Sequence, residues 1–262
     1  MYLVVYYVDM IGILYVFIAM CGLLIGSFLN AWMWRLKVGK SVMCGRSMCP
    51  HCGTTIQWRD LIPIISFVLL RGQCRHCHKR IDWQYPLVEA WVMFACIGLF
   101  AVHGEQITTL LIRDIAVISL LTSVFVYDLR YGEIEDWMTV VPGLIYIPIA
   151  LVLGVQSWLS IALGVGVGTG FFLLQYAVSK GKWIGGGDIR LGFFMGAVLG
   201  WPGILVGLLT AYILGAVVSL ILIGAKKATG KSTTPFGTYL SVGTAVALLA
   251  GDYIIEWYLG FL

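Results

Sequence analysis

Eight apolar segments limit this chain to one broad architecture, an all-α protein embedded in a membrane. The segments lie at about residues 10–34, 87–102, 109–127, 138–153, 158–178, 189–199, 203–225 and 236–255. A helix that crosses a bilayer needs about 20 apolar residues, so several of the eight are short. Hydrophobic residues make up 60% of the 262 residues and charged residues 11%, whereas soluble domains carry about 25% charged residues. The sequence therefore predicts a polytopic protein of about eight transmembrane helices, with Trp201 and Pro202 ending the sixth.

The long polar interruption at residues 37–86, here called the cysteine loop, carries two Cys-x-x-Cys pairs. The first is Cys49 with Cys52, and the second is Cys74 with Cys77. Four thiolates at this spacing predict a tetrahedral zinc site of zinc-ribbon type, to which Cys44 does not belong. Because zinc thiolates persist where thiols stay reduced, we expect the loop to face the cytosol. The chain then divides into a first transmembrane helix (1–36), a cytosolic zinc-binding domain (37–86) and a membrane domain (87–262).

The distribution of basic residues gives an independent test of this orientation. With the cysteine loop in the cytosol and the apolar segments alternating in direction, every Lys and Arg except Arg113 falls on the cytosolic side. Glu105, Asp252 and Glu256 fall on the other side. Eight spans in this orientation place both termini outside the cytosol.

Two acidic residues stand at the predicted cytosolic edge of the membrane. Asp128 ends the third apolar segment, and Asp188 opens the sixth directly after Gly185, Gly186 and Gly187. A carboxylate at the edge of a span is costly and is a candidate for function. The alternative is that each acid is a helix-end residue facing water. The glycines either let a peptide substrate approach closely or form an ordinary loop turn.

Short motifs follow one another along most of the chain: Gly26-Ser27-Phe28-Leu29-Asn30, the two cysteine pairs, Tyr85-Pro86-Leu87-Val88-Glu89, Asp128-Leu129 with Asp136, Gly185-Gly186-Gly187-Asp188, and Pro235-Phe236-Gly237. Together they resemble the motifs of the bacterial type IV prepilin peptidases, a family of GxGD-type aspartyl proteases. The sequence departs from the family pattern at Glu135, where proline is usual, and at Arg190, where lysine is common.

The resemblance implies a membrane aspartyl protease with Asp128 and Asp188 as its catalytic residues. Such enzymes remove the leader from type IV prepilin or pseudopilin precursors after a glycine, at the cytosolic face of the inner membrane. Many also methylate the new N-terminus with S-adenosylmethionine, although this chain shows no glycine-rich nucleotide motif after a strand. The implied partners are these precursors and the lipid bilayer, and we expect no nucleic acid.

The proteolytic chemistry follows from two aspartates that share one proton, because like charges at close range cannot both ionise readily. Asp128 is predicted at a helix C-terminus and Asp188 at a helix N-terminus, where the helix dipole favours negative charge. The resulting hypothesis makes Asp188 the ionised base and Asp128 the protonated acid.

Four further acids have open interpretations. Asp136 either supports the catalytic pair or is a solvated acid at a helix entry. Glu89 is a candidate for methyl transfer, at the cytosolic mouth of the second span. Glu133, Glu135 and Asp136 either attract a basic leader peptide or form a solvated loop.

Two other function classes fit parts of the sequence. Another GxGD-type intramembrane protease would share the aspartates but would not need the cysteine loop. A non-enzymatic scaffold or transporter with a zinc-stabilised loop would not need the aspartates, and transport predicts polar residues near the middle of the bilayer.

Overall fold

The structure is a computed structural model that describes residues 2–41, 45–227 and 234–261, with side chains from residue 10 onward; Cys44 lies outside the described residues. These parts are helical, and the only β pairing found in them is two isolated bridges in the cysteine loop. The long helices are α1 (Tyr2–Lys37), α3 (Gln84–Val102), α4 (Thr109–Tyr131), α5 (Val140–Val152), α6 (Trp158–Ser179), α7 (Gly186–Gly224) and α8 (Phe236–Leu259).

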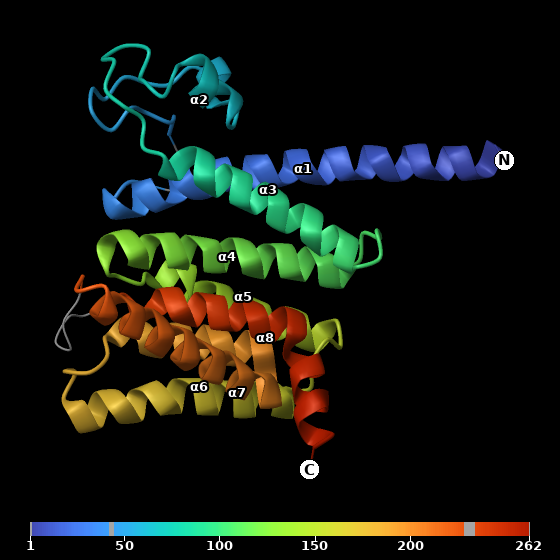
Figure 1. Ribbon diagram of the computed structural model, residues 1–262, viewed down its shortest axis with the longest axis vertical. Helices are drawn as coiled ribbons and strands as arrows, with labels where there is room; N and C mark the ends of the chain where they lie inside the picture. The colour runs from blue at the N-terminus through green and yellow to red at the C-terminus, as the bar shows by residue number, and fades with distance from the viewer. Residues whose placement is uncertain (1, 42–44, 228–233, 262) are drawn as a thin grey trace. The chain divides into compact units, whose positions relative to one another are not determined.

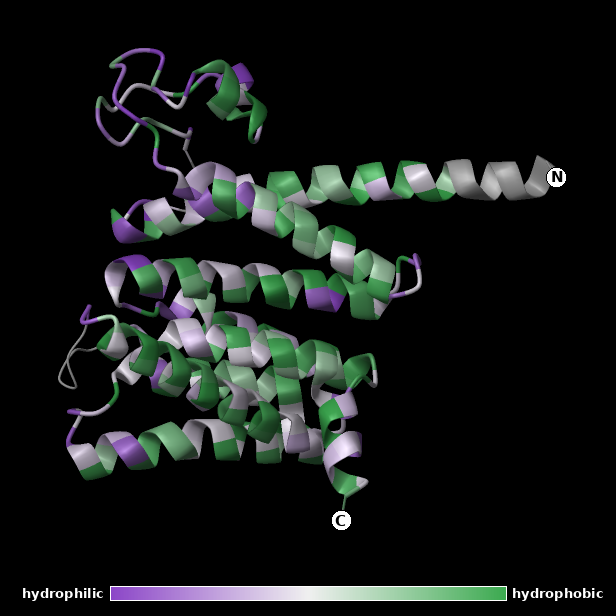
Figure 2. Ribbon diagram, in the orientation of Figure 1, coloured by the Kyte–Doolittle hydropathy of each residue, from purple (hydrophilic) through white to green (hydrophobic). Residues whose placement is uncertain are grey.

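Six of these helices are long and apolar enough to cross a membrane, namely α1, α3, α4, α6, α7 and α8. Hydrophobic residues cover them, while hydrophilic residues gather in the cysteine loop and at helix ends (Figure 2). The sequence predicted about eight spans. The difference has two causes: α5 is apolar but shorter, and α7 contains the predicted sixth and seventh segments as two helices that meet at a kink.

Helix α7 is broken near its middle rather than straight. Gly200 has φ +60° and Trp201 is extended, and Pro202 follows without an N–H group. An alanine Cβ at Gly207 would lie 2.8 Å from Leu199 Cδ1 and 3.4 Å from Met195 Cε. In a straight helix these positions would be roughly 12 and 18 Å apart along the axis. The two halves of α7 therefore double back on each other, which agrees with the predicted interruption.

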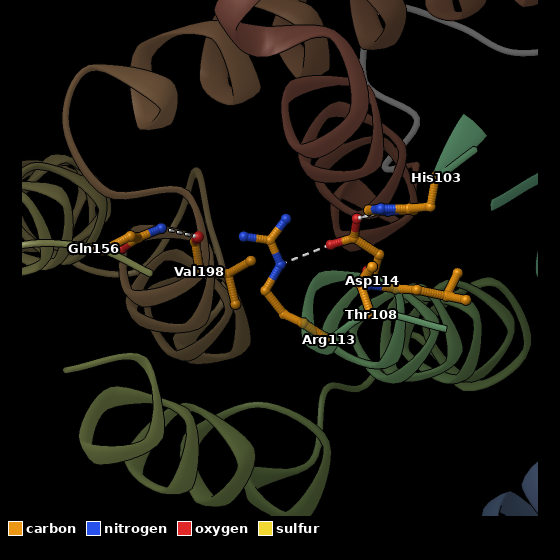
Figure 3. Close-up of polar contacts among 7 residues, drawn as sticks. His103, Thr108, Arg113, Asp114, Gln156 and Val198 are labelled. Carbon is orange, nitrogen blue, oxygen red and sulfur yellow. Dashed lines mark hydrogen bonds and ion pairs between the residues drawn. The ribbon is translucent and has the colours of Figure 1, made fainter. Parts of the chain in front are cut away.

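Side chains in α6 and in the segment just before it satisfy the backbone groups that this break frees. Ser160 Oγ accepts a hydrogen bond from Trp201 N at 3.0 Å and lies 3.1 Å from Trp201 O. Gln156 Nε2 donates to Val198 O at 2.6 Å (Figure 3). A helix break inside a membrane is tolerated when neighbouring side chains supply such partners.

The chain forms two compact units, residues 1–119 and 120–262, with α4 passing from one to the other. In the second unit α6 and α8 each pack against α7 (Figure 1). The α6–α7 contact is built on glycines: a Cβ at Gly164 would overlap Gly196 O, and one at Gly192 would lie 2.6 Å from Gly168 O. Small residues let membrane helices approach this closely.

In the first unit α1 packs along α3 through Gly22 and Gly26 (Figure 1). At the start of α4, Arg113 Nε and His103 Nε2 flank the carboxylate of Asp114 at 2.7 and 2.8 Å (Figure 3). Asp114 is 3% exposed. Arg113, which is the one basic residue outside the predicted charge pattern, is thus paired with the buried Asp114.

Candidate functional site

Asp128 lies in the last turn of α4, but its carboxylate is bound by the beginning of α8. Oδ2 accepts a hydrogen bond from the backbone N–H of Thr238 at 3.0 Å, and the Gly237 N–H is a second donor. These N–H groups belong to the first turn of α8, where a helix leaves its donors without internal partners. Asp128 is 5% exposed, so these bonds replace much of its hydration.

Asp188 lies in the first turn of α7 and is 7% exposed. Its Oδ2 accepts a hydrogen bond from the backbone N–H of Gly185 at 3.1 Å. The Asp128 carboxyl is near enough for its charge to act on Asp188. The structure thus brings together two buried carboxyl groups, each held by backbone N–H groups at a helix N-terminus.

This geometry removes the basis for assigning the proton by helix dipoles. The hypothesis assumed that Asp128 experiences a helix C-terminus, because it ends α4. Its carboxylate instead meets the N-terminus of α8, which favours negative charge just as the N-terminus of α7 does for Asp188. The helix ends therefore do not distinguish the acid from the base.

Ile134 occupies the space where α7 and α8 begin. A Cβ at Gly187 would lie 3.0 Å from Ile134 Cβ, and one at Gly237 would lie 2.7 Å from Ile134 Cδ1. The distance at Gly237 is shorter than real Cβ atoms show, and the distance at Gly187 is tighter than most Cβ contacts, so close approach favours glycine at both positions. By contrast, a Cβ at Gly186 would meet no atom within 4 Å. None of the three glycines before Asp188 has a positive φ, so they form no left-handed turn.

The acids that follow Asp128 contact different side chains. Asp136 Oδ1 lies 3.1 Å from Arg190 Nε, and Glu135 Oε1 accepts a hydrogen bond from Tyr127 at 3.3 Å. Glu133 is exposed. Asp136 and Glu135 therefore contact different side chains, one on α7 and one on α4. The sequence did not indicate these contacts or the packing of Ile134. The only sign that Thr238 belongs to the site was the Pro235-Phe236-Gly237 motif directly before it.

The four predicted cysteines of the loop converge. The Sγ atoms of Cys49, Cys52, Cys74 and Cys77 all lie within 4.8 Å of one another and could hold a metal ion. Hydrogen bonding with Thr54 lowers the pKa of the Cys52 thiol to about 6, whereas desolvation and the neighbouring cysteines raise the pKa of the Cys77 thiol to about 11.

The two cysteine pairs are built alike. Cys49 N donates to Thr54 O and Gly53 N donates to Cys49 O, both at 2.9 Å. In the second pair Cys74 N donates to Lys79 O at 2.9 Å and His78 N donates to Cys74 O at 3.0 Å. Gly53 and His78 both have positive φ. The same turn thus presents each pair of sulfur atoms.

An ion pair fixes the second of these turns. Arg75 Nε and Nη2 donate to the two oxygens of Asp60 at 2.9 and 2.7 Å. Asp60 lies in the short 3-10 helix η1 (Trp58–Leu61). Hydrogen bonding by the Arg75 guanidinium lowers the pKa of the Asp60 carboxyl below its ordinary value of 3.8.

Glu89 lies on α3 and is 6% exposed. Its Oε2 accepts a hydrogen bond from the backbone N–H of Ile64, which ties the cysteine loop to α3 at 2.8 Å. Nearby on α3, Gln84 Nε2 donates to Asn30 Oδ1 at 3.1 Å, while Gln84 Oε1 is buried without a hydrogen-bond partner.

Two protein-family models match this chain. Residues 20–103 match the model of the bacterial peptidase A24 N-terminal domain, and residues 115–220 match that of the type IV leader peptidase family. No solved structure matches the chain.

Curated relatives align with nearly the whole chain. A prepilin leader peptidase/N-methyltransferase of Bacillus subtilis is 31% identical over 252 residues, covering 95% of this chain and 98% of that protein. Proteins of the same name from Myxococcus xanthus and Legionella pneumophila are 34% and 27% identical, covering 83% and 95% of this chain and 66% and 95% of those proteins. This chain belongs to the type IV leader peptidase family.

Proposed function

We propose that the protein is a membrane aspartyl endopeptidase that removes the leader from type IV prepilin or pseudopilin precursors, cleaving after a glycine at the cytosolic face of the bacterial inner membrane. One observation carries the proposal: Asp128 and Asp188 are buried, within electrostatic range, and each held by N–H groups of a helix N-terminus. The relatives named above as prepilin leader peptidases support the same reaction.

The two carboxyl groups supply both proton-transfer steps of peptide hydrolysis. When they share one proton, the ionised carboxylate takes a proton from a water molecule, and that water attacks the scissile carbonyl. The protonated partner then donates its proton to the leaving amine, so one water is consumed for each bond cleaved. The pair titrates as a unit, so we assign no fixed role to either aspartate. The open space beside Gly186 lets an extended peptide reach the pair.

The helices and the family indicate an integral membrane protein, and we further propose its orientation. The cysteine loop and the aspartates face the cytosol, and both termini lie outside. Support comes from the Lys and Arg residues, of which only Arg113 falls outside the cytosolic side. Within this frame residues 87–262 act as the protease domain, and residues 37–86 as a separate zinc-binding domain.

We propose zinc as the metal of the cysteine loop. A tetrahedral zinc site with bonds of about 2.3 Å has sulfur–sulfur edges of roughly 3.8 Å. The distance between Cys49 Sγ and Cys77 Sγ is 3.9 Å, and all four sulfur atoms lie within 4.8 Å of one another. Four cysteines leave no open position, so the ion would be structural rather than catalytic.

The names of the relatives also support N-methylation with S-adenosylmethionine. The buried Glu89 carboxyl and the unpaired Gln84 Oε1 are acceptors, and the methyl donor carries amino groups and a positive charge that suit them. These residues would bind and orient the donor, which supplies the methyl group.

One experiment tests both activities. Purified protein in lipid is mixed with a pilin precursor and S-adenosylmethionine, and mass spectrometry records leader loss and the methyl increment together. Asp128→Asn and Asp188→Asn change little volume and should each abolish cleavage while precursor binding remains. Cleavage within about tenfold of wild type in both variants would remove the aspartates from the mechanism.

A further inference from the structure

Arg190 makes two contacts with the segment that follows Asp128. Its Nη1 donates to the backbone carbonyl of Ile134 at 3.2 Å, and its Nε lies 3.1 Å from Asp136 Oδ1. Arg190 lies on α7 two residues after Asp188. The Arg190 guanidinium therefore connects α7, which carries Asp188, to the segment that follows Asp128.

Ile134, whose carbonyl Arg190 contacts, is packed where α7 and α8 begin. Ile134 is 9% exposed and fills the space beside both Gly187 and Gly237. Gly187 adjoins Asp188 in sequence, and Gly237 is a backbone donor to Asp128. A shift of Ile134 would therefore change the separation of the two helix ends that hold the carboxyl groups.

We infer that Arg190 is a positioning residue: by holding Ile134 through its carbonyl and through Asp136, it sets the spacing of Asp128 and Asp188. This inference rests on the proposed function. It also gives Asp136 a role distinct from binding the leader peptide, because its carboxylate is already paired.

Geometry rather than stability is the expected readout. The side chains of Arg190 and Asp136 are 45% and 59% exposed, and exposed ion pairs contribute only about 0–1 kcal/mol. Misplacing reacting groups by about 1 Å, however, can cost on the order of 100-fold in rate. Loss of Arg190 should therefore lower kcat with little change in KM or in melting temperature.

The first set of variants removes the guanidinium. Arg190→Met should lower kcat for precursor cleavage about tenfold at unchanged KM, whereas Arg190→Lys should recover part of this loss, since an ammonium pairs with Asp136 but lacks the fork that also serves Ile134. Lys182→Met is the matched control. Lys182 is an exposed cation on the loop before α7, and its removal should leave kcat unchanged.

The second set acts on the proposed link without altering Arg190. Ile134→Val deletes the Cδ1 atom that faces Gly237 and keeps the Cβ that faces Gly187. It should lower kcat several-fold, and it remains informative if Arg190→Met fails to fold. Asp136→Asn should lower kcat less than Arg190→Met, and the double variant should be no slower than Arg190→Met alone, because both changes break one connection.

The wild-type protein separates the two proposals. Failure of the wild type to cleave the precursor would refute the proposed function itself. If the wild type cleaves and both Arg190→Met and Ile134→Val keep its kcat, or if their defects lie in KM alone, the positioning role is wrong.

Discussion

Gly237 lies so close to Asp128 that a methyl group on its Cα would come within 2.8 Å of Asp128 Oδ2. The contact joins the end of α4 to the beginning of α8. It exists because the carboxylate binds directly to the backbone N–H groups of that first turn. The absence of a side chain at position 237 is therefore part of how the aspartate is held.

Gly237→Ala should disable cleavage. The added methyl would also lie 2.7 Å from Ile134 Cδ1, so both the carboxylate and Ile134 must move. Overpacking of this kind costs about 1–3 kcal/mol of stability, and displacement of Asp128 should lower kcat by about 100-fold. Steady-state cleavage and thermal melting measure the two effects.

Gly251→Ala is the control on the same helix. Its added methyl would meet nothing nearer than Ala247 Cβ at 4.0 Å, an ordinary contact. It should keep wild-type kcat. Equal activity of both alanine variants would show that the close approach at Gly237 has no part in catalysis.

The sequence predicted what local patterns can encode. The all-α class, the cysteine convergence and the interruption near Pro202 follow from hydropathy, spacing and glycine and proline chemistry. It did not predict that α8 supplies donors to Asp128, because that bond joins residues 110 positions apart. The dipole argument omitted α8 for the same reason, since the helix that contains Asp128 differs from the helix that its carboxylate meets.

Metal binding should keep the cysteine loop folded. Most of its large apolar residues, such as Trp58, Val68 and Leu69, are exposed, so little hydrophobic burial supports it. Protein purified under reducing conditions should contain about one zinc per chain, and chelation should speed tryptic cleavage within residues 37–86. Cys52→Ser should lose the metal.

Cys21→Ser is the matched control, because Cys21 lies on α1 and outside the four-cysteine cluster. It should keep the zinc content of the wild type. Metal-free protein with a protease-resistant loop would contradict the structural role of the ion.

The Asp60–Arg75 pair should stabilise the loop at all but strongly acidic pH. The pKa of Asp60 is lowered, so its contribution is complete above 3.8 and is lost only as pH falls through the lower folded-state value. Wild type and Asp60→Asn should therefore differ in proteolysis of the loop by a constant factor from about pH 5 to 8. Pepsin digestion below about pH 4 should show the difference shrinking. A difference that closes near pH 6 would exclude this carboxylate as its source.

Glu89→Gln should separate methylation from cleavage. Glutamine keeps the volume and an acceptor for the Ile64 N–H, so only the negative charge is lost. Leader removal should stay within about threefold of wild type while the methyl increment falls at least about tenfold. Glu105→Gln, a change of another acid in the same unit, should affect neither product mass. Full methylation by Glu89→Gln would exclude Glu89 from the donor site.

Glu133 should attract a leader peptide that is basic before its cleavage glycine. Glu133 is exposed and therefore accessible to a peptide, and Glu135 and Asp136 contact Tyr127 and Arg190. Glu133→Gln should therefore raise KM about two- to fivefold at low salt with kcat unchanged, the result expected when exposed ion pairs of about 0–1 kcal/mol are lost. Adding Glu135→Gln should raise KM little further.

The effect of Glu133→Gln on KM should shrink as the ionic strength approaches about 1 M, where screening acts within about 3 Å. Glu256→Gln removes an exposed acid on α8 and should leave KM unchanged. A KM for Glu133→Gln that equals wild type at low salt would mean that Glu133 is a solvated loop residue.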